Sequence, residues 1–363
     1  MKKIWIGIDD TDSKNGGCTT HIAKTIIKFL IDDGFDLIGY PRLVRLNPNI
    51  PWKTRGNGAI SFRIGLGARY KNKIGEIDKS EIFCFSRVKK SSDLTKQVDR
   101  IREIILDVFK DYAHVRDINT NPGFVILKDK PSFDVYKKGV REILYLNEIK
   151  NIINSLKGFY KGYKNSRGLI GAVASVAWMT SKDSTYELIT YRSEEKWSTK
   201  RLVEDESVKN IDRLYPSTFD NYDYKNKHNR IVPNSPCPIL YGIRGDDAND
   251  LIESYSLIKS EKVDSWIIFQ TNQGTDDHIQ SQIISQIKIF QSVKVKGRVI
   301  VKPHTIIGGH VLFTISNDLD EKIDCASYEP TKQFRNIIRE LLIGDVVEVY
   351  GGVRKKPLTI NIE

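Results

Sequence analysis

The sequence predicts an α+β multidomain protein that ends in a small β-barrel. Its 363 residues allow two to four domains of ordinary size. Strand-like and helix-like segments alternate along most of the chain, and from about residue 288 onward the pattern is three strands, a helix and two strands, the order expected of an OB-fold. We therefore place domain boundaries near residues 130 and 285, giving three parts at 1–130, 131–285 and 286–363.

The first part opens with a buried strand, because Ile4–Ile8 is a short apolar run rich in β-branched residues. A helix follows the loop at 9–20, since Ile22, Ile26 and Leu30 recur at helical spacing and Gly34 ends the pattern. The remaining expectations are strands at 35–39, 58–64 and 124–127, a proline-containing loop at 41–58, and an amphipathic helix at 93–112.

The second and third parts are predicted from the same patterns. In the second part we expect helices at 132–145, 147–156 and 246–258, strands at 186–191, 240–243 and 266–269, a small-residue stretch at 166–175 and a long loop at 213–238. In the third part we expect strands at 293–301, 310–315, 320–326, 345–349 and 358–362, with a helix at 330–342.

The charge of the chain favours an anionic partner. Lys and Arg number 57 against 46 Asp and Glu, which gives a net charge of +11 and a pI near 9.2. The excess is concentrated at 53–90, with ten bases and three acids, and at 128–167, with ten bases and four acids. Nucleic acid is the commonest partner of such a chain, although a merely basic surface is the simpler alternative.

Several classes of protein are excluded. No stretch approaches the roughly 18 apolar residues of a membrane span, and the N-terminus lacks the apolar run and cleavage site of a secretory signal, so we expect no membrane association and a cytoplasmic location. The four cysteines, none at C-x-x-C spacing, predict neither a disulfide framework nor a cysteine-based zinc site.

The strongest candidate for chemistry is the group of Asp9, Asp10 and Asp12 directly after the first strand. Carboxylate oxygens suit Mg²⁺, and Mg²⁺ at a strand end would bring nucleotide phosphates. The structural alternative is a cluster of Asx turns that caps the following helix.

Two neighbouring segments have residues suited to phosphate. Gly17, Thr19 and Thr20 precede or begin a helix, where backbone N–H groups bind anions and the hydroxyls bind phosphate or act as nucleophiles. The segment is not a Walker A motif, and an ordinary threonine N-cap is the alternative. Further along, Lys53, Arg55 and Asn57 lie among glycines, which indicates either phosphate contacts or a basic hairpin tip.

Two more groups are candidates for binding. Asp276 and Asp277 precede His278 after another buried strand and suit a cationic substrate, a second metal or acid–base work, or else the first turn of a helix. Basic residues in the expected OB-fold suit a nucleic-acid backbone: Arg298, Lys302, Arg335, Arg354, Lys355 and Lys356.

Six strings together resemble one family, the archaeal isoleucine tRNA 2-agmatinylcytidine synthetases. They are GIDDTDS at 7–13, GGCTT at 16–20, RLNPNIPWKTRGNGA at 45–59, NPG at 121–123, SRGLIGA at 166–172 and FQTNQGTDDH at 269–278. The resemblance runs in order over essentially the whole chain.

The resemblance implies an ATP-dependent ligase that attaches agmatine to the wobble cytidine of the CAU anticodon of an isoleucine tRNA. It implies a kinase-like first domain, a ferredoxin-like second domain, and an OB-fold that binds the tRNA acceptor stem. ATP would be consumed to AMP, a phosphoryl group would activate the cytidine 2-carbonyl oxygen, and the agmatine amine would displace it.

The resemblance also implies roles for individual residues. Asp9, Asp10 and Asp12 would hold Mg²⁺ and ATP phosphates, and Thr19 matches a threonine that becomes phosphorylated. The remaining assignments are Gly17, Thr20, Lys53, Arg55 and Asn57 for phosphates; Arg45, Arg167, Gly168, Gly171, Asp276 and Asp277 for cytidine or agmatine; and Arg298, Lys302, Arg335 and Arg354 for tRNA.

There is one departure from the family, whose members end in a zinc ribbon that holds the anticodon loop. Residues 1–363 contain no C-x-x-C pair, so we expect no zinc site in this chain. Two alternatives to the ligase remain open: a Mg²⁺-dependent phosphohydrolase built on the three aspartates, and a tRNA-binding protein without catalysis.

Overall fold

The computed structural model describes residues 2–13, 16–91, 93–180, 183–355 and 358–362, which form two compact units. The first, called here the sheet unit, comprises Met1–Arg45, Thr54–Tyr136 and Leu144–Thr275. The second, the barrel unit, comprises Leu46–Lys53, Lys137–Ile143 and Asp276–Glu363. Within the described residues, no helix has the length and apolar character needed to cross a membrane.

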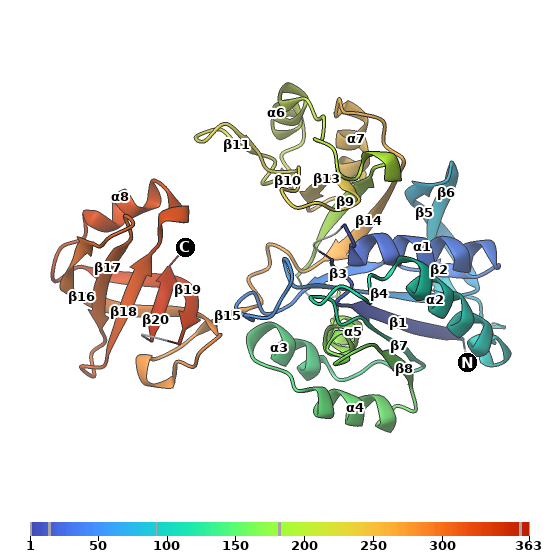
Figure 1. Cartoon of the computed structure of the whole chain (residues 1–363), viewed down its shortest axis with the longest axis horizontal. Helices are drawn as coiled ribbons and strands as arrows, with labels where there is room; N and C mark the ends of the chain where they lie inside the picture. Colours follow the sequence, from blue (N-terminus) through green and yellow to red (C-terminus); the bar gives the residue numbers. More distant parts are fainter. Residues whose placement is uncertain (1, 14–15, 92, 181–182, 356–357, 363) are drawn as a thin grey trace. The chain divides into compact units, whose positions relative to one another are not determined.

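The sheet unit is built on one mixed sheet of twelve strands, ordered β10-β13-β9-β14-β5-β6-β2-β4-β1-β7-β8 with β3 between β14 and β4 (Figure 1). The strands are β1 Lys3–Asp9, β2 Asp36–Ile38, β3 Arg42–Arg45, β4 Gly58–Gly65, β5 Gly67–Ile77, β6 Ser80–Val88, β7 Gly123–Leu127, β8 Phe159–Gly162, β9 Thr185–Tyr191, β10 Thr218–Phe219, β13 Ile239–Gly245 and β14 Ser265–Thr271. Strands from both sides of residue 130 thus share one sheet, and the boundaries at 130 and 285 stay predictions.

Helices and a small ribbon complete this unit. The helices are α1 Thr19–Asp32, η1 Thr95–Gln97, α2 Val98–Tyr112, α3 Phe133–Arg141, α4 Leu146–Ser155, α5 Gly168–Ala177, η2 Glu194–Lys196, α6 Asp205–Leu214 and α7 Ala248–Leu257. The ribbon pairs β11 Tyr222–Asp223 with β12 His228–Asn229. Helix α3 begins in the sheet unit, and its later residues belong to the barrel unit.

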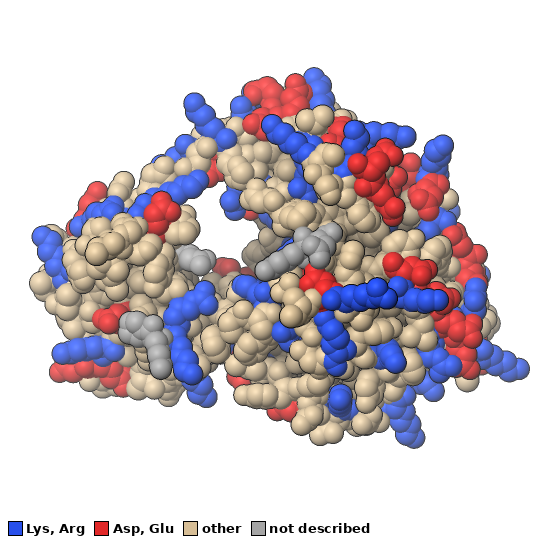
Figure 2. Space-filling model, viewed as in Figure 1, with Lys and Arg blue, Asp and Glu red and all other residues tan. Residues whose placement is uncertain are grey.

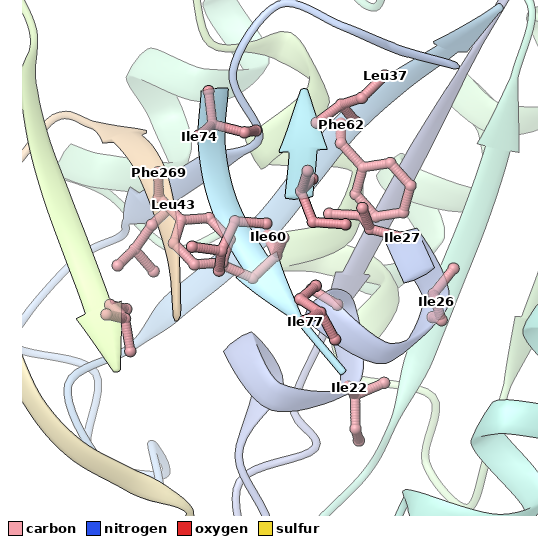
Figure 3. Packing of buried hydrophobic residues seen from close by; sticks show 14 of the residues in the cluster. Ile22, Ile26, Ile27, Leu37, Leu43, Ile60, Phe62, Ile74, Ile77 and Phe269 are labelled. Carbon is pink, nitrogen blue, oxygen red and sulfur yellow. The ribbon is translucent and has the colours of Figure 1, made fainter. Parts of the chain in front are cut away.

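The two faces of β1 pack against different helices. Ile4, Ile6 and Ile8 are fully buried in a core to which α1 contributes Ile22 and Ile26; the same core contains residues of β2–β5 and β14 (Figure 3). On the opposite face lies Gly7, where a Cβ atom would come 2.2 Å from the carbonyl oxygen of Ala172 in α5. Because side chains alternate along a strand, Trp5 and Asp9 share this α5 face with Gly7.

Helix α5 is buried on nearly every side, which explains its composition. Nine of its ten residues are buried, and its sequence GLIGAVASVA consists of small and apolar residues. A helix surrounded by protein needs no polar stripe, so its periodicity is weak. The sequence indicated a small-residue stretch here, and the structure shows that it is a helix packed closely on β1, β4 and β7.

The barrel unit is a closed sheet. Strands β16 Ser292–Thr305, β17 Val311–Ser316, β18 Lys322–Ser327, β20 Thr359–Ile362 and β19 Val346–Arg354 are neighbours in this order, and β19 pairs back with β16. The short β15 Ile279–Ser281 runs parallel to β16, and η3 Ile284–Gln286, η4 Glu329–Thr331 and α8 Phe334–Arg339 complete the unit. All five predicted strands and the helix between the third and fourth are confirmed.

Two separate segments, Leu46–Lys53 and Lys137–Ile143, fold with the barrel. Hydrogen bonds of the first segment show how it is attached. Asn47 Nδ2 donates to the carbonyl oxygen of Phe290 at 2.9 Å, and Asn49 Nδ2 donates to Ser292 Oγ at 2.8 Å. Both asparagines are buried. The barrel unit therefore includes chain from the family-like string at 45–59, which local sequence patterns do not reveal.

Other expectations need correction. The predicted loop at 41–58 contains strand β3, because Leu43 and Val44 are buried where β3 pairs with β4 and β14. Likewise, the long loop expected at 213–238 contains β10, β11 and β12. The helix expected at 330–342 is shorter, since α8 covers only Phe334–Arg339 after the 3₁₀ turn that contains Pro330.

The basic excess is not gathered in one place on the face shown in Figure 2. There, Lys and Arg are interspersed with Asp and Glu over the sheet unit. Exposed basic residues on β5 and near the end of β6 include Arg69, Lys71 and Arg87, whereas Lys73 forms ion pairs with Glu76 and Glu81.

Candidate active site

The acidic loop after β1 lies at an edge of the sheet where several predicted motifs meet. Asp9 pairs with Gly123 at the start of β7, and Gly123 pairs with Gly162 at the end of β8. Asn121 N donates to the carbonyl oxygen of Asp10, and Gly168 N donates to that of Asn121. The segments at 7–13, 121–123 and 166–172 therefore lie together around the N-terminus of α5.

Glycine is required at the contact between this loop and α5. A Cβ atom on Gly168 would lie 2.5 Å from the carbonyl oxygen of Asp9 and from the backbone nitrogen of Gly123. Gly171 is buried in the next turn of the same helix. Both glycines were predicted as substrate residues; in the structure they are buried in α5, and Gly168 allows its close packing.

Asp9 and Asp10 experience different environments. Burial raises the pKa of Asp9 well above its ordinary value, and the neighbouring Asp10 carboxylate adds to this rise. Burial also raises the pKa of Asp10, but this is opposed by the Arg167 guanidinium, whose Nη2 lies 2.9 Å from Oδ2. Asp10 also adopts a left-handed backbone conformation with φ of 57°. Arg167, predicted as a substrate residue, is thus the charge partner of Asp10.

Asp12 holds the first residue of α1. Its Oδ1 accepts hydrogen bonds from Thr19 N at 2.8 Å and from Thr19 Oγ1 at 3.0 Å. Thr11 Oγ1 in turn donates to Thr19 Oγ1 at 2.9 Å. The N-cap residue Cys18 makes no side-chain cap, so Asp12 takes that role across the loop. The Thr19 hydroxyl is consequently buried, fixed in direction and in contact with a carboxylate, the arrangement of an activated nucleophile.

A pocket of about 190 Å³ opens beside Thr19 within the sheet unit. Its polar lining combines the acidic side chains of Asp12 and Glu187 with several arginines and two threonines. The lining residues that bear on its chemistry are Asp12, Thr19, Thr20, Arg45, Arg55, Glu187, Arg230 and Arg244, together with the buried cysteines Cys18 and Cys237. Four guanidinium groups in so small a volume suit phosphate groups.

Glu187 organises two of these arginines. It is buried in β9, with Oε2 3.3 Å from Arg45 Nη2 and Oε1 3.5 Å from Arg244 Nε. Arg45 is further fixed by Gln273, whose Oε1 accepts from Arg45 Nε at 3.1 Å, and by Asn272, whose Oδ1 accepts from Arg45 N at 2.7 Å. Asn272 and Gln273 therefore hold Arg45 in position.

Glu187, Arg230 and Arg244 were not predicted from the sequence. One signal was available for Glu187, because an acid inside the otherwise apolar and aromatic strand at 186–191 needs a cationic partner. No local pattern distinguishes Arg230 or Arg244 from surface arginines, since each comes from a different segment of the second half of the chain.

Arg55 is used differently from the expected phosphate contact. Its guanidinium donates to the carbonyl oxygens of Gly17 at 2.9 Å and Pro236 at 2.6 Å, and also to that of Ser13. It therefore ties the loop before α1 to the segment at 233–238. Thr20 and Gly17 lie beside it, and a Cβ atom on Gly17 would collide with Thr11 and His114.

Other predicted residues lie elsewhere. Asn57 has a left-handed backbone with φ of 50° just before β4, and Lys53, which belongs to the barrel unit, donates to the carbonyl oxygen of Pro48. Asp276 and Asp277 also belong to the barrel unit, where Arg141 Nε donates to the carbonyl oxygen of Asp277 at 2.8 Å. The alternative that they begin a helix is wrong, because strand β15 follows them.

The four arginine and lysine residues assigned to tRNA all lie on the barrel. Arg298 Nη1 donates to the carbonyl oxygen of Gly344 and Arg335 Nη1 to that of Gly309. Lys302 and Arg354 are exposed, and no ion pair of either appears in the described part of the chain. Lys355 is exposed as well, whereas Lys356 lies outside the described residues.

No group of three or more His, Cys, Asp or Glu side chains is arranged to hold a metal ion among the residues that the structure describes. In the acidic loop, Arg167 pairs with Asp10 and Thr19 bonds to Asp12, as given above. Mg²⁺ commonly uses only one or two protein carboxylates and completes its shell with substrate phosphates and water. The loop fits that mode of binding rather than a cage of protein ligands.

In a mixed α/β protein, a carboxylate-bound threonine beside an arginine-lined pocket is typical of proteins that bind phosphate groups. Comparison with known proteins is more specific. Residues 5–164 match the model of the TiaS TCKD domain, and residues 166–278 match that of the TiaS FLD domain. The chain therefore belongs to the TiaS family.

Individual relatives agree with this assignment over nearly the whole chain. The isoleucine tRNA 2-agmatinylcytidine synthetase TiaS of Methanocaldococcus jannaschii is 39% identical over 371 residues, which cover 100% of this chain and 81% of that protein. The crystal structure of TiaS in complex with its isoleucine tRNA and ATP has a TM-score of 0.84 at 37% identity, covering 99% of this chain and 79% of that one. The corresponding complex with isoleucine tRNA, AMPCPP and agmatine has a TM-score of 0.83 at 36% identity, covering 99% and 82%.

Proposed function

We propose that this chain is an ATP-dependent ligase that joins agmatine to the 2-position of the wobble cytidine in the CAU anticodon of an isoleucine tRNA. The observation that carries the proposal is the match of the whole of this chain to 81% of the length of an isoleucine tRNA 2-agmatinylcytidine synthetase. Solved complexes of the family with this tRNA, ATP, an ATP analogue and agmatine support the same set of substrates.

The chemistry follows from the weak reactivity of the cytidine 2-carbonyl. Its oxygen is a poor leaving group, so transfer of a phosphoryl group from ATP to that oxygen prepares the carbon for attack. The primary amine of agmatine then forms a C–N bond at the 2-position, the C–O bond breaks, and the phosphate leaves with the oxygen. Transfer of one phosphoryl group leaves ADP, and release of a second phosphoryl group to water gives AMP. The overall reaction thus consumes one water and yields AMP and two phosphates, and the amine loses a proton as the C–N bond forms.

Within this scheme, Thr19 is the residue that takes up a phosphoryl group. Its hydroxyl donates to Asp12 Oδ1 at 3.0 Å, so Asp12 accepts the proton when the oxygen attacks phosphorus. Arg45, Arg230 and Arg244 line the same pocket and neutralise phosphate charge as it moves during transfer. Arg55 fixes the loop that carries Gly17, while Thr20 lies beside Thr19 on α1.

Asp9 and Asp12 are the side chains that would hold Mg²⁺, because Asp10 is neutralised by Arg167. The ion would supply positive charge to the ATP phosphates, as it does in other phosphoryl-transfer enzymes. Burial favours the proton-bound form of Asp9, whose pKa is raised, so loss of that proton accompanies cation binding.

The remaining assignments concern agmatine and tRNA. Agmatine carries a guanidinium and an amine, and Asp276 and Asp277 supply carboxylates for these groups. We assign the closed sheet of the barrel unit to the OB-fold class on its strand order, with Lys302 and Arg354 as contacts to the tRNA backbone. The parts before it correspond to the kinase-like and ferredoxin-like domains.

A modification assay tests the proposal. The chain is incubated with ATP, Mg²⁺, labelled agmatine and an unmodified transcript of the isoleucine tRNA with its CAU anticodon, beside a methionine tRNA transcript with the same anticodon. We expect label only in the isoleucine transcript and AMP in proportion. ATP hydrolysis that ignores both tRNA and agmatine would favour a phosphohydrolase instead. Binding of the transcript without any ATP turnover would favour a non-catalytic tRNA-binding protein.

A further inference from the structure

Several cations from different elements surround the ring of Trp5, which lies in the N-terminal half of β1. The guanidinium carbon of Arg42 lies 4.5 Å from the centre of the Trp5 ring, that of Arg63 lies 5.1 Å away, and Nζ of Lys130 lies 5.8 Å away. Lys3, two residues before Trp5, adds a fourth charge. We call Lys3, Arg42, Arg63 and Lys130 the Trp5 cluster.

Strand register explains why these residues meet. Trp5 lies opposite Arg63 in the β1–β4 pair and opposite Leu127 in the β1–β7 pair, three residues before Lys130. Arg42 lies opposite Ser61 in the β3–β4 pair, and Ser61 is two residues from Arg63 on the same face of β4. Three members of the cluster, Lys3, Arg42 and Arg63, are therefore placed by strands, while Lys130 lies three residues after the end of β7.

The cluster also contacts the end of helix α5. Arg42 Nη1 and Lys130 Nζ both donate to the carbonyl oxygen of Trp178, at 2.8 Å and 2.6 Å, and Trp178 is the C-cap residue of α5. Arg63 Nε donates to the carbonyl oxygen of Ile38 at 3.0 Å. A helix C-terminus carries a partial charge of roughly −0.5, which balances only a small part of four positive charges.

No carboxylate balances the rest. Within the described residues, no Asp or Glu forms an ion pair with any member of the Trp5 cluster. Arg42 is only 6% exposed, and burial together with Arg63 lowers its pKa to about 9. Burial, followed by Arg42, Arg63 and Lys3, lowers the pKa of Lys130 to about 8. Buried cations are rarely left without an anion, because desolvation is costly.

We infer that the Trp5 cluster is a binding site for a phosphate group. Two guanidiniums and two ammoniums converge there, and a phosphate group offers such a set of donors three strong acceptor oxygens and up to two negative charges. Lys3 is exposed, and Arg63 and Lys130 are half-buried, so the ligand reaches the cluster from solvent on that side. Trp5 lies four residues before Asp9, about 13 Å along the strand, so this site differs from the candidate active site.

The phosphate group has two possible sources, a free phosphate ion or a phosphodiester of the RNA backbone. Thermal unfolding of the whole chain with rising inorganic phosphate, at constant ionic strength set with chloride, tests the shared chemistry. We expect the unfolding midpoint of the wild type to rise by about 3–6 °C at saturating phosphate. The rise should persist in Lys130→Arg and in the control Lys96→Met, an exposed lysine of the same unit. It should be clearly smaller in Lys130→Met, in which only the arginine-lined pocket beside Thr19 is left to bind phosphate.

A tRNA arm distinguishes the two sources. If the ligand is a phosphodiester, Lys130→Met weakens binding of the tRNA transcript about tenfold, lowers the salt dependence by about one unit, and phosphate competes with tRNA. If the ligand is the free ion, the wild type and Lys130→Met bind tRNA equally, while the rise of the unfolding midpoint with phosphate still differs between them. An equal phosphate-induced rise in the wild type and in Lys130→Met, with unchanged tRNA binding in Lys130→Met, would overturn the site. These readouts do not depend on ligase activity.

Discussion

At the scale of single residues, Thr19 stands out because its hydroxyl has two polar partners although it is almost completely buried. Asp12 accepts from it, and Thr11 donates to it. A helix cap needs only the bond from the Thr19 backbone N–H to Asp12, which is also present at 2.8 Å. The additional contacts fix the direction of the oxygen, which is what a phosphoryl acceptor requires.

Substitutions at Thr19 distinguish the role of its hydroxyl from the role of its backbone N–H in capping the helix. We expect Thr19→Ala to lower agmatine incorporation by about 1,000-fold or more, because the acceptor oxygen is lost. The backbone N–H still bonds to Asp12, but the buried Thr11 hydroxyl loses its acceptor, so unfolding free energy should fall by about 1–3 kcal/mol. Thr19→Ser keeps the oxygen and should retain activity within about tenfold. Uptake of label from γ-labelled ATP into the protein provides the direct readout, and an alanine variant that is still labelled to the wild-type extent would contradict the role of Thr19.

Asp9 is a residue whose ionised side chain lowers the stability of the fold. Burial raises its pKa in the folded chain above the ordinary value of 3.8. Between these two values the folded state binds a proton that the unfolded state has lost, so stability falls as pH rises from the unfolded pKa to the folded one. At neutral pH the carboxyl therefore destabilises the fold.

Asp9→Asn removes that cost and keeps an acceptor for the backbone N–H of Asp10. We expect its unfolding midpoint to exceed that of the wild type by about 2–5 °C near pH 7.5, and the two to converge below about pH 4. Ligation should be lost, since Mg²⁺ loses a ligand. Melting curves from about pH 3.5 to 8 check this, and a difference that is constant with pH would rule out titration of Asp9 as its cause.

At the scale of elements, helix α5 is the part on which the candidate active site depends. Its N-terminus lies against the acidic loop, and its C-terminus faces the Trp5 cluster. Acids near the N-terminus and bases near the C-terminus both complement the helix dipole. The close approach of α5 to β1 is possible only because residue 7 has no side chain.

Gly7→Ala should therefore displace the helix. The new methyl group would lie 2.2 Å from the carbonyl oxygen of Ala172, which belongs to helix backbone and has no flexible way to move. We expect a loss of about 2–4 kcal/mol in unfolding free energy, measured by urea denaturation, with a parallel loss of ligation.

Gly34→Ala is the matched control. Its Cβ would meet open space, and only the backbone strain of a φ of 90° remains, about 1 kcal/mol. Activity should be retained in that variant. Equal destabilisation by the two substitutions would show that the contact of Gly7 with α5 is not the cause.

Element formation was predictable where the signal is local. The strand at 4–8 and the helix after it follow from apolar runs and their spacing, and β1 and α1 confirm them. Helix α5 was not predicted, because a helix buried on nearly every side lacks the amphipathic period that identifies surface helices. Strand β3 was missed since its burial depends on β4 and β14, which lie outside the local pattern.

At the scale of the whole molecule, two kinds of basic side chain occur on the barrel: some bond to its backbone and others are exposed. Arg298 and Arg335 bond to backbone carbonyls of the barrel, whereas Lys302 and Arg354 are exposed. The second pair is therefore the better candidate for a ligand contact, because binding there costs no internal hydrogen bond to a carbonyl.

Charge reversal tests this division. Lys302→Glu and Arg354→Glu should each weaken tRNA binding about tenfold and reduce its salt dependence, with no change in melting temperature beyond about 1 °C. Arg335→Glu, by contrast, should lower the melting temperature of the barrel, because it removes the hydrogen bond to the carbonyl oxygen of Gly309. Filter binding at several salt concentrations measures the effect, with Lys96→Glu on the sheet unit as control. If Lys302→Glu and Arg354→Glu bind tRNA like the wild type, the barrel contact lies elsewhere.

The sequence by itself determined the residues of the acidic loop, Thr19 and the succession of strands and helix along the barrel segment, because each is written in contiguous residues or in a local period. It also determined the family, through six strings in order. Only the tertiary structure brought Glu187, Arg230 and Arg244 to Thr19, turned Arg55 toward backbone carbonyls, and paired Arg167 with Asp10. The physical reason is that sheet pairing is non-local: β9 and β13 meet β3 and β4 only through β14, and no local pattern records which polar groups such pairing will bury.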